Sequence, residues 1–189
     1  MRSVDVLREE HDAVLGVLGL LETAAEAAAR GRPMPADVFS DVQEFITVFV
    51  DQCHHHKEEG AVFPRLEARP GGRALIARLE REHATGRHLA ANYVAAVSQY
   101  VPGDQTSSGR LAEAARAYRA ALAAHIDAET TELYPAMEAW LRDADGAMVL
   151  EFDRIEVEEI GAGTHERLHG MIDSLPGRIE ARSVSATGA

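Results

Sequence analysis

The chain has 189 residues, of which 46% are hydrophobic and only 5% are aromatic. A chain of this length buries one core without dividing into several, and a composition rich in alanine and leucine favours helices over sheets. The net charge of −12 makes nucleic acids and anionic membranes unfavourable partners.

The N-terminal sequence and the cysteine content bear on the cellular compartment in which the protein is expected. The residues from Met1 to Asp5 lack an apolar signal core, and no apolar run reaches the roughly 18 residues of a membrane span. Cys53 is the only cysteine, so no intrachain disulfide can form. We therefore expect a cytoplasmic protein, either a monomer or a homodimer, that binds neither nucleic acid nor a membrane.

Breaks rich in glycine, proline and polar residues divide the chain into long segments. They lie at residues 31–35, 69–72, 102–109 and 143–146. Within each segment apolar residues recur at steps of three and four, as Val14, Leu18 and Leu21 do, which places them on one helix face. Because short connections make long helices antiparallel, the sequence predicts an all-α, up-down-up-down four-helix bundle. The predicted helices cover about residues 4–30, 36–68, 73–101 and 108–142.

The segment after the bundle is also predicted to be helical, since Met148 and Phe152 lie at helical spacing before a break at Gly161. We expect one domain with an appendage. Its parts are the bundle over residues 1–145, a C-terminal helix packed on it over 146–178, and a flexible tail over 179–189.

An internal repeat is the strongest functional signal. Each half of the chain has one histidine on its first predicted helix, and a His-x-x-x-Glu motif begins 43 residues later in one half and 42 in the other. An aromatic residue and a proline follow the motif at the same offsets in both halves. The repeated residues are His11, His54 and Glu58 in the first half, and His83, His125 and Glu129 in the second.

These six residues are candidate metal ligands. A histidine and a glutamate four apart on a helix lie one above the other, so both reach the same point in a core. Burying four imidazoles and two carboxylates without partners costs several kcal/mol, and cations are their natural partners. Six ligands in a two-fold repeat favour two ions, and this donor set suits iron, manganese or zinc, with the carboxylates as bridges. The alternative is a buried His-Glu network without metal. A ferritin-like centre is disfavoured, because it has Glu-x-x-His instead.

The run of three histidines leaves two registers open. His54 pairs with Glu58 and His55 pairs with Glu59 at the same spacing. The repeat favours the first register. His55 and His56 are then expected at the surface or behind the ligands.

Other polar and aromatic residues are expected outside the metal shell. His88 is predicted at the rim of the bundle, and His165 and His169 as a pair on a helix surface, since no repeat supports them. Cys53 is expected to be a small buried hydrophobe. Tyr93, Tyr100 and Tyr118 lie on core stripes and are predicted to pack there, the alternative being that one supplies a proton or an electron beside the metals.

The same motifs resemble the hemerythrin-like HHE cation-binding family over about residues 4–142. The stretch HHHKEEGAVFP at residues 54–64 is similar to the family's HHxKEExxLFP signature, and LREEH at residues 7–11 to its opening helix. EHATGR at residues 82–87 resembles its EHxxGR segment, and HIDAETTELYP at residues 125–135 resembles HIxxExxxLFP.

The resemblance implies a non-haem centre of two iron ions, bridged by oxide or hydroxide and by Glu58 and Glu129. Oxygen-carrying members have a second histidine on the third helix and a carboxylate five residues after the last histidine. Here Arg87 and Thr130 stand at those positions. The resemblance therefore implies one imidazole fewer and more open coordination positions than in an oxygen carrier.

The expected function is binding or reduction of a small oxidant, which is oxygen, hydrogen peroxide or nitric oxide. The alternatives are an oxygen or redox sensor, an iron donor for cluster repair, and a structural bundle loaded with zinc. We expect no second substrate pocket, because the seam residues Val14, Leu18, Leu79 and Leu122 leave little room beside the metals.

Overall fold

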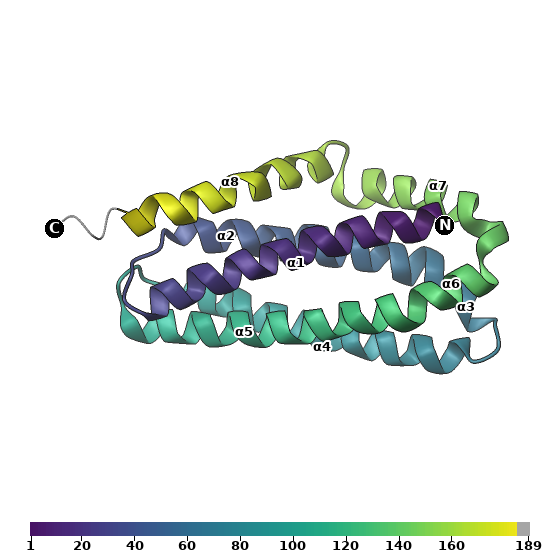
Figure 1. The fold of residues 1–189 in the computed structure, drawn as a ribbon, viewed down its shortest axis with the longest axis horizontal. Helices are drawn as coiled ribbons and strands as arrows, with labels where there is room; N and C mark the ends of the chain where they lie inside the picture. The colour runs from purple at the N-terminus through teal and green to yellow at the C-terminus, as the bar shows by residue number, and fades with distance from the viewer. Residues whose placement is uncertain (185–189) are drawn as a thin grey trace.

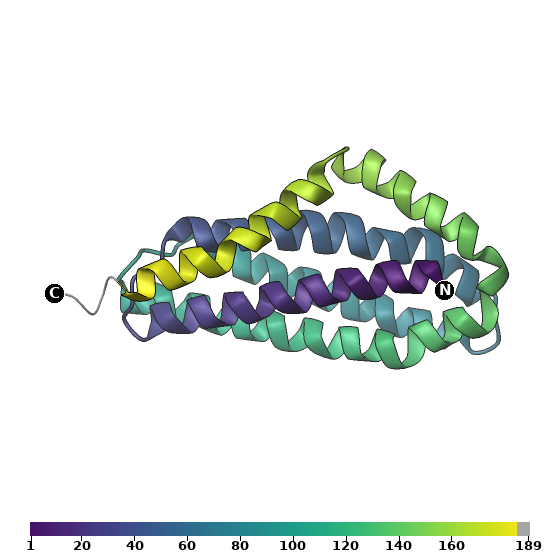
Figure 2. The same cartoon turned by 45° about the horizontal axis from the view of Figure 1, so that its top comes forward.

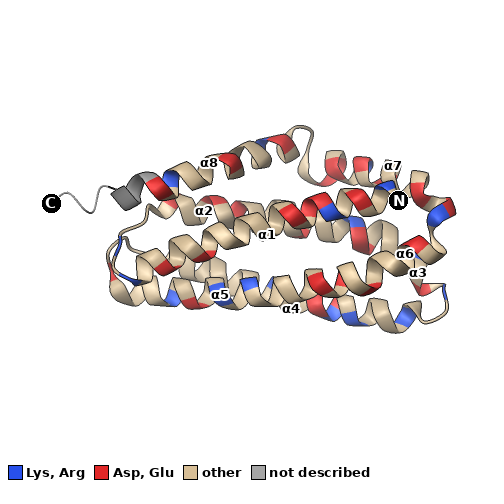
Figure 3. Ribbon diagram, viewed as in Figure 1, with Lys and Arg blue, Asp and Glu red and all other residues tan. Residues whose placement is uncertain are grey.

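The computed structural model describes the backbone of residues 1–184 and the side chains as far as residue 180, and it contains helices but no strands in that part of the chain. Within these residues, no helix is long and apolar enough to cross a membrane. Acidic and basic residues are interspersed along the helices (Figure 3).

Four long antiparallel rods form the bundle (Figures 1 and 2). The first is α1 (Arg2–Ala29) and the third is α4 (Gly72–Ser98). The second consists of α2 (Ala36–Glu44), η1 (Phe45–His55), η2 (Glu58–Val62) and α3 (Phe63–Glu67). The fourth consists of α5 (Gln105–Ala128), η3 (Glu129–Leu133) and α6 (Tyr134–Trp140). No predicted helix end lies more than three residues from the observed one, so the predicted all-α bundle is confirmed.

The C-terminal segment differs from the single helix that we expected. After a short turn, η4 (Arg142–Ala144), it forms α7 (Asp145–Ile155), continued by η5 (Glu156–Ile160), and then α8 (Thr164–Val184). Gly161 and Gly163 separate them with φ angles of 84° and 80°, a left-handed conformation that glycine adopts without steric cost. α7 packs against α1 and η2, whereas α8 packs against α2 and α1. Helical structure thus extends past residue 178, and residues 185–189 of the expected tail lie outside the described part.

Two of the breaks from regular α-helix have a common cause. Pro64 and Pro135 lack an N–H and press on the carbonyl four residues before them. In both halves a five-residue stretch that ends two residues before the proline, η2 or η3, widens into a π-helical turn that accommodates this. Each π-helical turn begins at the glutamate of the repeated motif, Glu58 or Glu129.

The interior is divided into two apolar clusters along the bundle axis. One contains Val14, Val50, Tyr93 and Leu122, and the other contains residues nearer to the N-terminus of α1, such as Leu7. A layer of buried polar residues separates them. Its members are Glu10, His11, His54, His55, Lys57, Glu58, His83, His125 and Glu129.

Candidate metal centre

The polar layer brings all six sequence-predicted ligands together from the four rods. Glu58 and Glu129 are 0% exposed and His83 is 1% exposed, so water reaches none of them freely. Two groups of four side chains have donor atoms within 4.8 Å of one another. One group is His11, His54, Glu58 and Glu129, and the other is Glu58, His83, His125 and Glu129.

The first group lies between α1 and the second rod. The Nε2 atom of His11 is 3.0 Å from Oε2 of Glu129 and 3.1 Å from Nε2 of His54. The Nε2 atom of His54 is 3.8 Å from Oε1 of Glu58. Because these atoms are all lone-pair donors facing one point, an ion at that point satisfies them together.

The second group is its counterpart between α4 and α5. The Nε2 atom of His83 is 3.3 Å from Oε2 of Glu58 and 3.7 Å from Oε1 of Glu129. The Nε2 atom of His125 is 3.0 Å from the same Glu129 oxygen. Each carboxylate therefore faces both groups, one oxygen to each side, as a bridge between two ions requires.

The donor atoms fit metal ions in spacing and in chemistry. Two ligand atoms bound to one ion at about 2.1 Å lie about 3.0–3.4 Å apart at octahedral or tetrahedral angles. Both carboxylate oxygens of Glu58 and Glu129, together with Nε2 of His83 and of His125, are buried without a hydrogen-bond partner. Leaving so many buried polar atoms unpaired costs several kcal/mol, which a bound cation offsets.

A sequence model of the hemerythrin HHE cation binding domain matches residues 2–137. The chain belongs to this family. Uncharacterized proteins from Mycobacterium bovis and from two strains of Mycobacterium tuberculosis are each 26% identical to it over 131 residues. The match covers 69% of this chain and 51% of each relative, so the chain spans about half the length of the curated relatives it matches. No solved structure matches the chain.

The imidazoles of this HHE domain are fixed from behind by carboxylates that precede the repeated histidines in sequence. The Nδ1 atom of His54 is 2.8 Å from Oε2 of Glu10, and Nδ1 of His125 is 2.9 Å from Oε2 of Glu82. In both halves, therefore, the Glu-His pair of the first helix supplies one candidate ligand, the histidine, and a glutamate that faces the outer nitrogen of another candidate ligand. Such outer hydrogen bonds orient a ligating imidazole and raise its basicity.

The other two imidazoles have different outer partners in the two halves. The Tyr134 ring stacks near His11 and the Phe63 ring near His83, each pair with centroids 5.5 Å apart. The Tyr134 hydroxyl is 2.8 Å from Nδ1 of His11. Phe63 has no hydroxyl, and Oε1 of Glu59 lies 2.6 Å from Nδ1 of His83 instead. Sequence reasoning missed Tyr134, although its place in the repeat marks it.

His55 is the main correction to the predicted site. We expected it at the surface or behind the ligands, but it is 3% exposed and its ring stacks on His83 with centroids 4.0 Å apart. One of its ring nitrogens lies within 4.8 Å of the donor atoms of His83 and His125, and its Nε2 has no hydrogen-bond partner. With His55, five imidazoles lie in the polar layer, whereas the sequence led us to expect four there. The register itself is as predicted, since Glu58 is inside and Glu59 is outside.

Electrostatics favour positive charge at the centre. Burial raises the pKa of Glu129, but the facing imidazoles of His11, His125 and His83 outweigh it and hold the pKa well below its usual range. Burial lowers the pKa of His83, yet the three facing glutamates raise it to about 11. His55 differs, because burial lowers its pKa to about 3 and keeps it a neutral imidazole with a free lone pair.

A third cluster of potential ligands, Glu10, Cys53 and Glu156, already has a cation. The ammonium group of Lys57 is 0% exposed and forms ion pairs with Glu10 and with Glu156. Burial disfavours its charged form, but these carboxylates outweigh burial and raise the pKa of Lys57. Burial also raises the pKa of Cys53 to about 12, so its thiol remains neutral. The Lys57 ammonium therefore fills this cluster. It links Glu156 of η5 to Glu10, the carboxylate that faces Nδ1 of His54.

The remaining predicted residues lie outside the two groups of candidate ligands. His88 is exposed, as predicted, and Tyr93, Tyr100 and Cys53 are buried. His165 and His169 do not join the centre. They are half-buried rather than at the surface, with their Nε2 atoms 2.9 Å apart and their rings against Phe49.

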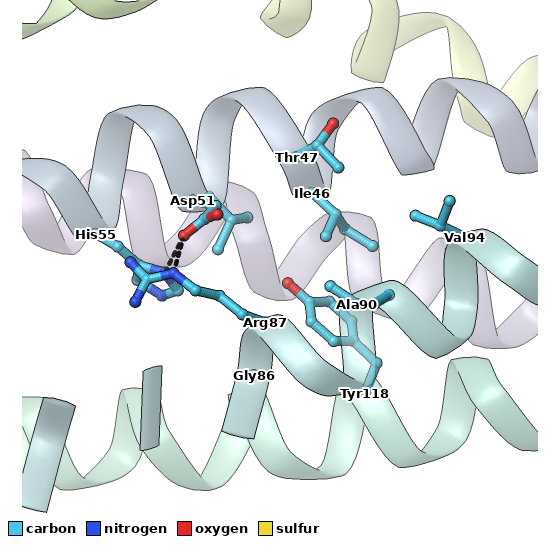
Figure 4. Close-up of a pocket in the computed structure, with 11 residues that line it drawn as sticks. Ile46, Thr47, Asp51, His55, Gly86, Arg87, Ala90, Val94 and Tyr118 are labelled. Atoms are coloured by element: carbon cyan, nitrogen blue, oxygen red, sulfur yellow. Dashed lines mark hydrogen bonds and ion pairs between the residues drawn. The ribbon is translucent and has the colours of Figure 1, made fainter. Parts of the chain in front are cut away.

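A cavity of about 320 Å³ adjoins the centre, where we expected little room. Figure 4 shows it between η1 and α4, with His55 at one end and the Tyr118 ring inside. The seam residues named in that expectation, such as Leu79, are indeed buried. The space comes instead from Gly86 and Ala90, which lie further along nearly the same face of α4 as Leu79 and are too small to fill it.

Proposed function

We propose that this HHE domain holds two iron ions and reduces peroxides with them. One ion is held by His11 and His54, the other by His55, His83 and His125, and both are held by Glu58 and Glu129. The observation that carries the proposal is the position of the two glutamates, since each faces both groups of donors. A pair of ions that each release one electron matches a reaction that consumes two.

The donor set supports iron over zinc. Zinc prefers four ligands, whereas the half with His55, His83 and His125 offers five protein donors once Glu58 and Glu129 are included. Imidazole and carboxylate ligands together suit iron that has exchangeable positions. When bound, the two ions supply the electrons for cleaving an O–O bond.

The chain's own residues prepare the site for that chemistry. The apolar clusters above and below the polar layer exclude bulk water. Glu10, Glu82, Glu59 and the Tyr134 hydroxyl hold the Nδ1 sides of the imidazoles and direct every Nε2 atom inward. The centre therefore keeps its geometry while its charge changes by two.

The test compares iron-loaded with zinc-loaded protein, because zinc occupies similar donors but has no redox chemistry. We expect the ferrous protein to consume hydrogen peroxide, with two ferric ions formed per peroxide, and the zinc protein to be inert. Nitric oxide is offered in parallel as the competing substrate. Equal peroxide consumption by the two forms, or iron oxidised at the rate of free ferrous ion, contradicts the proposal. Release of iron on oxidation indicates the iron-donor alternative.

A further inference from the structure

The cavity beside His55 is much larger than a small oxidant needs. Its volume of about 320 Å³ compares with the ~30 Å³ that one water molecule occupies in the liquid. Hydrogen peroxide, with two oxygen atoms, fills only a small part of it. The volume lies instead at the lower end of the range for small organic ligands, about 300–1,000 Å³.

Apolar side chains dominate the walls of the cavity. Ile46 and Val50 come from η1, and Ala90 and Val94 come from α4 (Figure 4). Gly86 opens the wall further, because a Cβ atom added there meets nothing within 4 Å. Glycine inside a helix costs about 1 kcal/mol relative to alanine, and here no neighbouring atom requires it. The absent side chain leaves space for a hydrocarbon group.

One polar group inside the cavity has no partner. Tyr118 is 2% exposed, and its hydroxyl makes no hydrogen bond to any residue of the described part. It points toward the side of the cavity where Asp51 and Arg87 lie (Figure 4). The hydroxyl faces the cavity, so a ligand with a hydrogen-bonding oxygen can bind it there in place of water.

The mouth of the cavity disfavours an anion. Arg87 lies there, but its Nε atom donates to Asp51 at 2.6 Å and its second guanidinium nitrogen donates to Glu59 at 2.8 Å. The guanidinium charge is therefore neutralised by two carboxylates, in a chain whose net charge is −12. A neutral ligand enters this mouth more readily than a carboxylate or phosphate does.

The inner end of the cavity touches the metal centre. His55 lines the cavity, and its ring stacks on His83. Arg87 is linked to the centre through Glu59, because the Glu59 oxygen that accepts from Arg87 also faces Nδ1 of His83. A molecule in the cavity therefore lies next to the ion held by His83 and His125.

We infer that this cavity binds the hydrocarbon part of a neutral organic hydroperoxide, with the oxygen end toward His55 and the Tyr118 hydroxyl. The inference rests on the proposed function and names its substrate class. In the reaction the O–O bond of ROOH breaks, two electrons from the two ferrous ions reduce it, and two protons from solvent complete ROH and H₂O.

The binding test uses a redox-inert probe, 2-phenyl-2-propanol, which is the alcohol formed from cumene hydroperoxide. Its Kd for zinc-loaded protein is measured by calorimetry. Gly86→Leu fills the cavity from a position with free space, and we expect it to raise the Kd at least tenfold. The matched control is Gly16→Leu, since Gly16 is an exposed helical glycine with equally free space. An unchanged Kd in Gly86→Leu at unchanged metal content overturns the inference.

The kinetic test compares cumene hydroperoxide with hydrogen peroxide as oxidants of the ferrous protein. We expect Gly86→Leu to lower the ratio of the two rate constants at least tenfold, and Gly16→Leu to preserve it. An unchanged ratio in Gly86→Leu overturns the inference and leaves the proposed function standing. If the unsubstituted protein reduces neither peroxide, the proposed function falls and the substrate assignment falls with it, even if the alcohol binds.

Discussion

The imidazole of His55 lies flat against that of His83, with ring centroids 4.0 Å apart and an interplanar angle of 22°. The two residues belong to neighbouring rods, η1 and α4. Asp51, four residues before His55, faces its Nδ1 at 3.5 Å, so the Nε2 atom is left toward the centre. In the proposed centre this arrangement gives the ion at His83 and His125 a third imidazole, from the same helix that carries His54.

His55→Ala is therefore expected to weaken the ion held by His83 and His125. Loss of one imidazole from a metal site lowers affinity by more than the 10–100-fold that loss of an outer partner costs. Iron content after dialysis should fall from two ions per chain toward one. His56→Ala is the matched control, because the neighbouring His56 is half-exposed and only faces Glu159 at 3.8 Å. Two tightly held ions in His55→Ala contradict its role as a ligand.

The Tyr134 hydroxyl offers a test of the outer contacts. Tyr134→Phe keeps the ring beside His11 but removes the hydrogen bond to Nδ1, so we expect metal affinity to fall about 10–100-fold. Tyr93→Phe removes a comparable buried hydroxyl that donates to the Phe39 carbonyl oxygen. That control should lower the free energy of unfolding by about 1 kcal/mol without changing metal affinity. Competition with a chelator measures the affinity, and equal affinities in the two variants contradict the assignment.

Glu58→Ala removes a carboxylate that faces both groups of donors. We expect the variant to lose at least one metal ion and most of its peroxide reduction, because a bridge and a charge disappear together. Exposed His88→Ala should retain both metal and activity. Full activity of Glu58→Ala at unchanged metal content would show that the bridging role is wrong.

Acid sensitivity should reveal the link between η5 and the buried Lys57. A hydrogen bond from His165, and a further one from Lys57, lower the pKa of Glu156 from 4.5 to about 2. Because the folded-state pKa is depressed, this stabilisation is present above pH 4.5 and is lost as the pH falls toward 2. Glu156→Gln should thus lower the free energy of unfolding by about 1–3 kcal/mol at pH 6, and by progressively less toward pH 3.

Urea denaturation of metal-free protein across this pH range measures that effect. Glu158→Gln is the control, since Glu158 is exposed and pairs only with Arg154 four residues before it. A destabilisation by Glu156→Gln that does not change with pH would contradict the ionic origin of the link.

Local patterns were enough to predict the bundle and six of the inward-facing donors. Steps of three and four residues define a helix face, and a His-x-x-x-Glu motif places both side chains on it. The repeat also selected Glu58 over Glu59 correctly, because Glu129 has no competing neighbour. The position of the helix ends followed from glycine and proline, whose effects are equally local.

The inward position of His55 and the contacts of Tyr134 and Glu156 could not be predicted from local sequence patterns. Consecutive residues of a regular α-helix point about 100° apart, so a regular helix does not turn both His54 and His55 fully inward. The η1 segment is π-helical, so more residues complete each turn and both side chains reach the interior. Tyr134 and Glu156 contact partners 123 and 99 residues away, and such pairings arise only from the packing of distant helices.

The most direct test of the central claim is a crystal of the iron-loaded protein measured on both sides of the iron absorption edge. We predict two anomalous peaks about 3–4 Å apart in the polar layer. One should lie between His11 and His54, the other among His55, His83 and His125, with Glu58 and Glu129 between them. A single peak in this layer, or iron bound only elsewhere on the molecule, would contradict a two-metal centre.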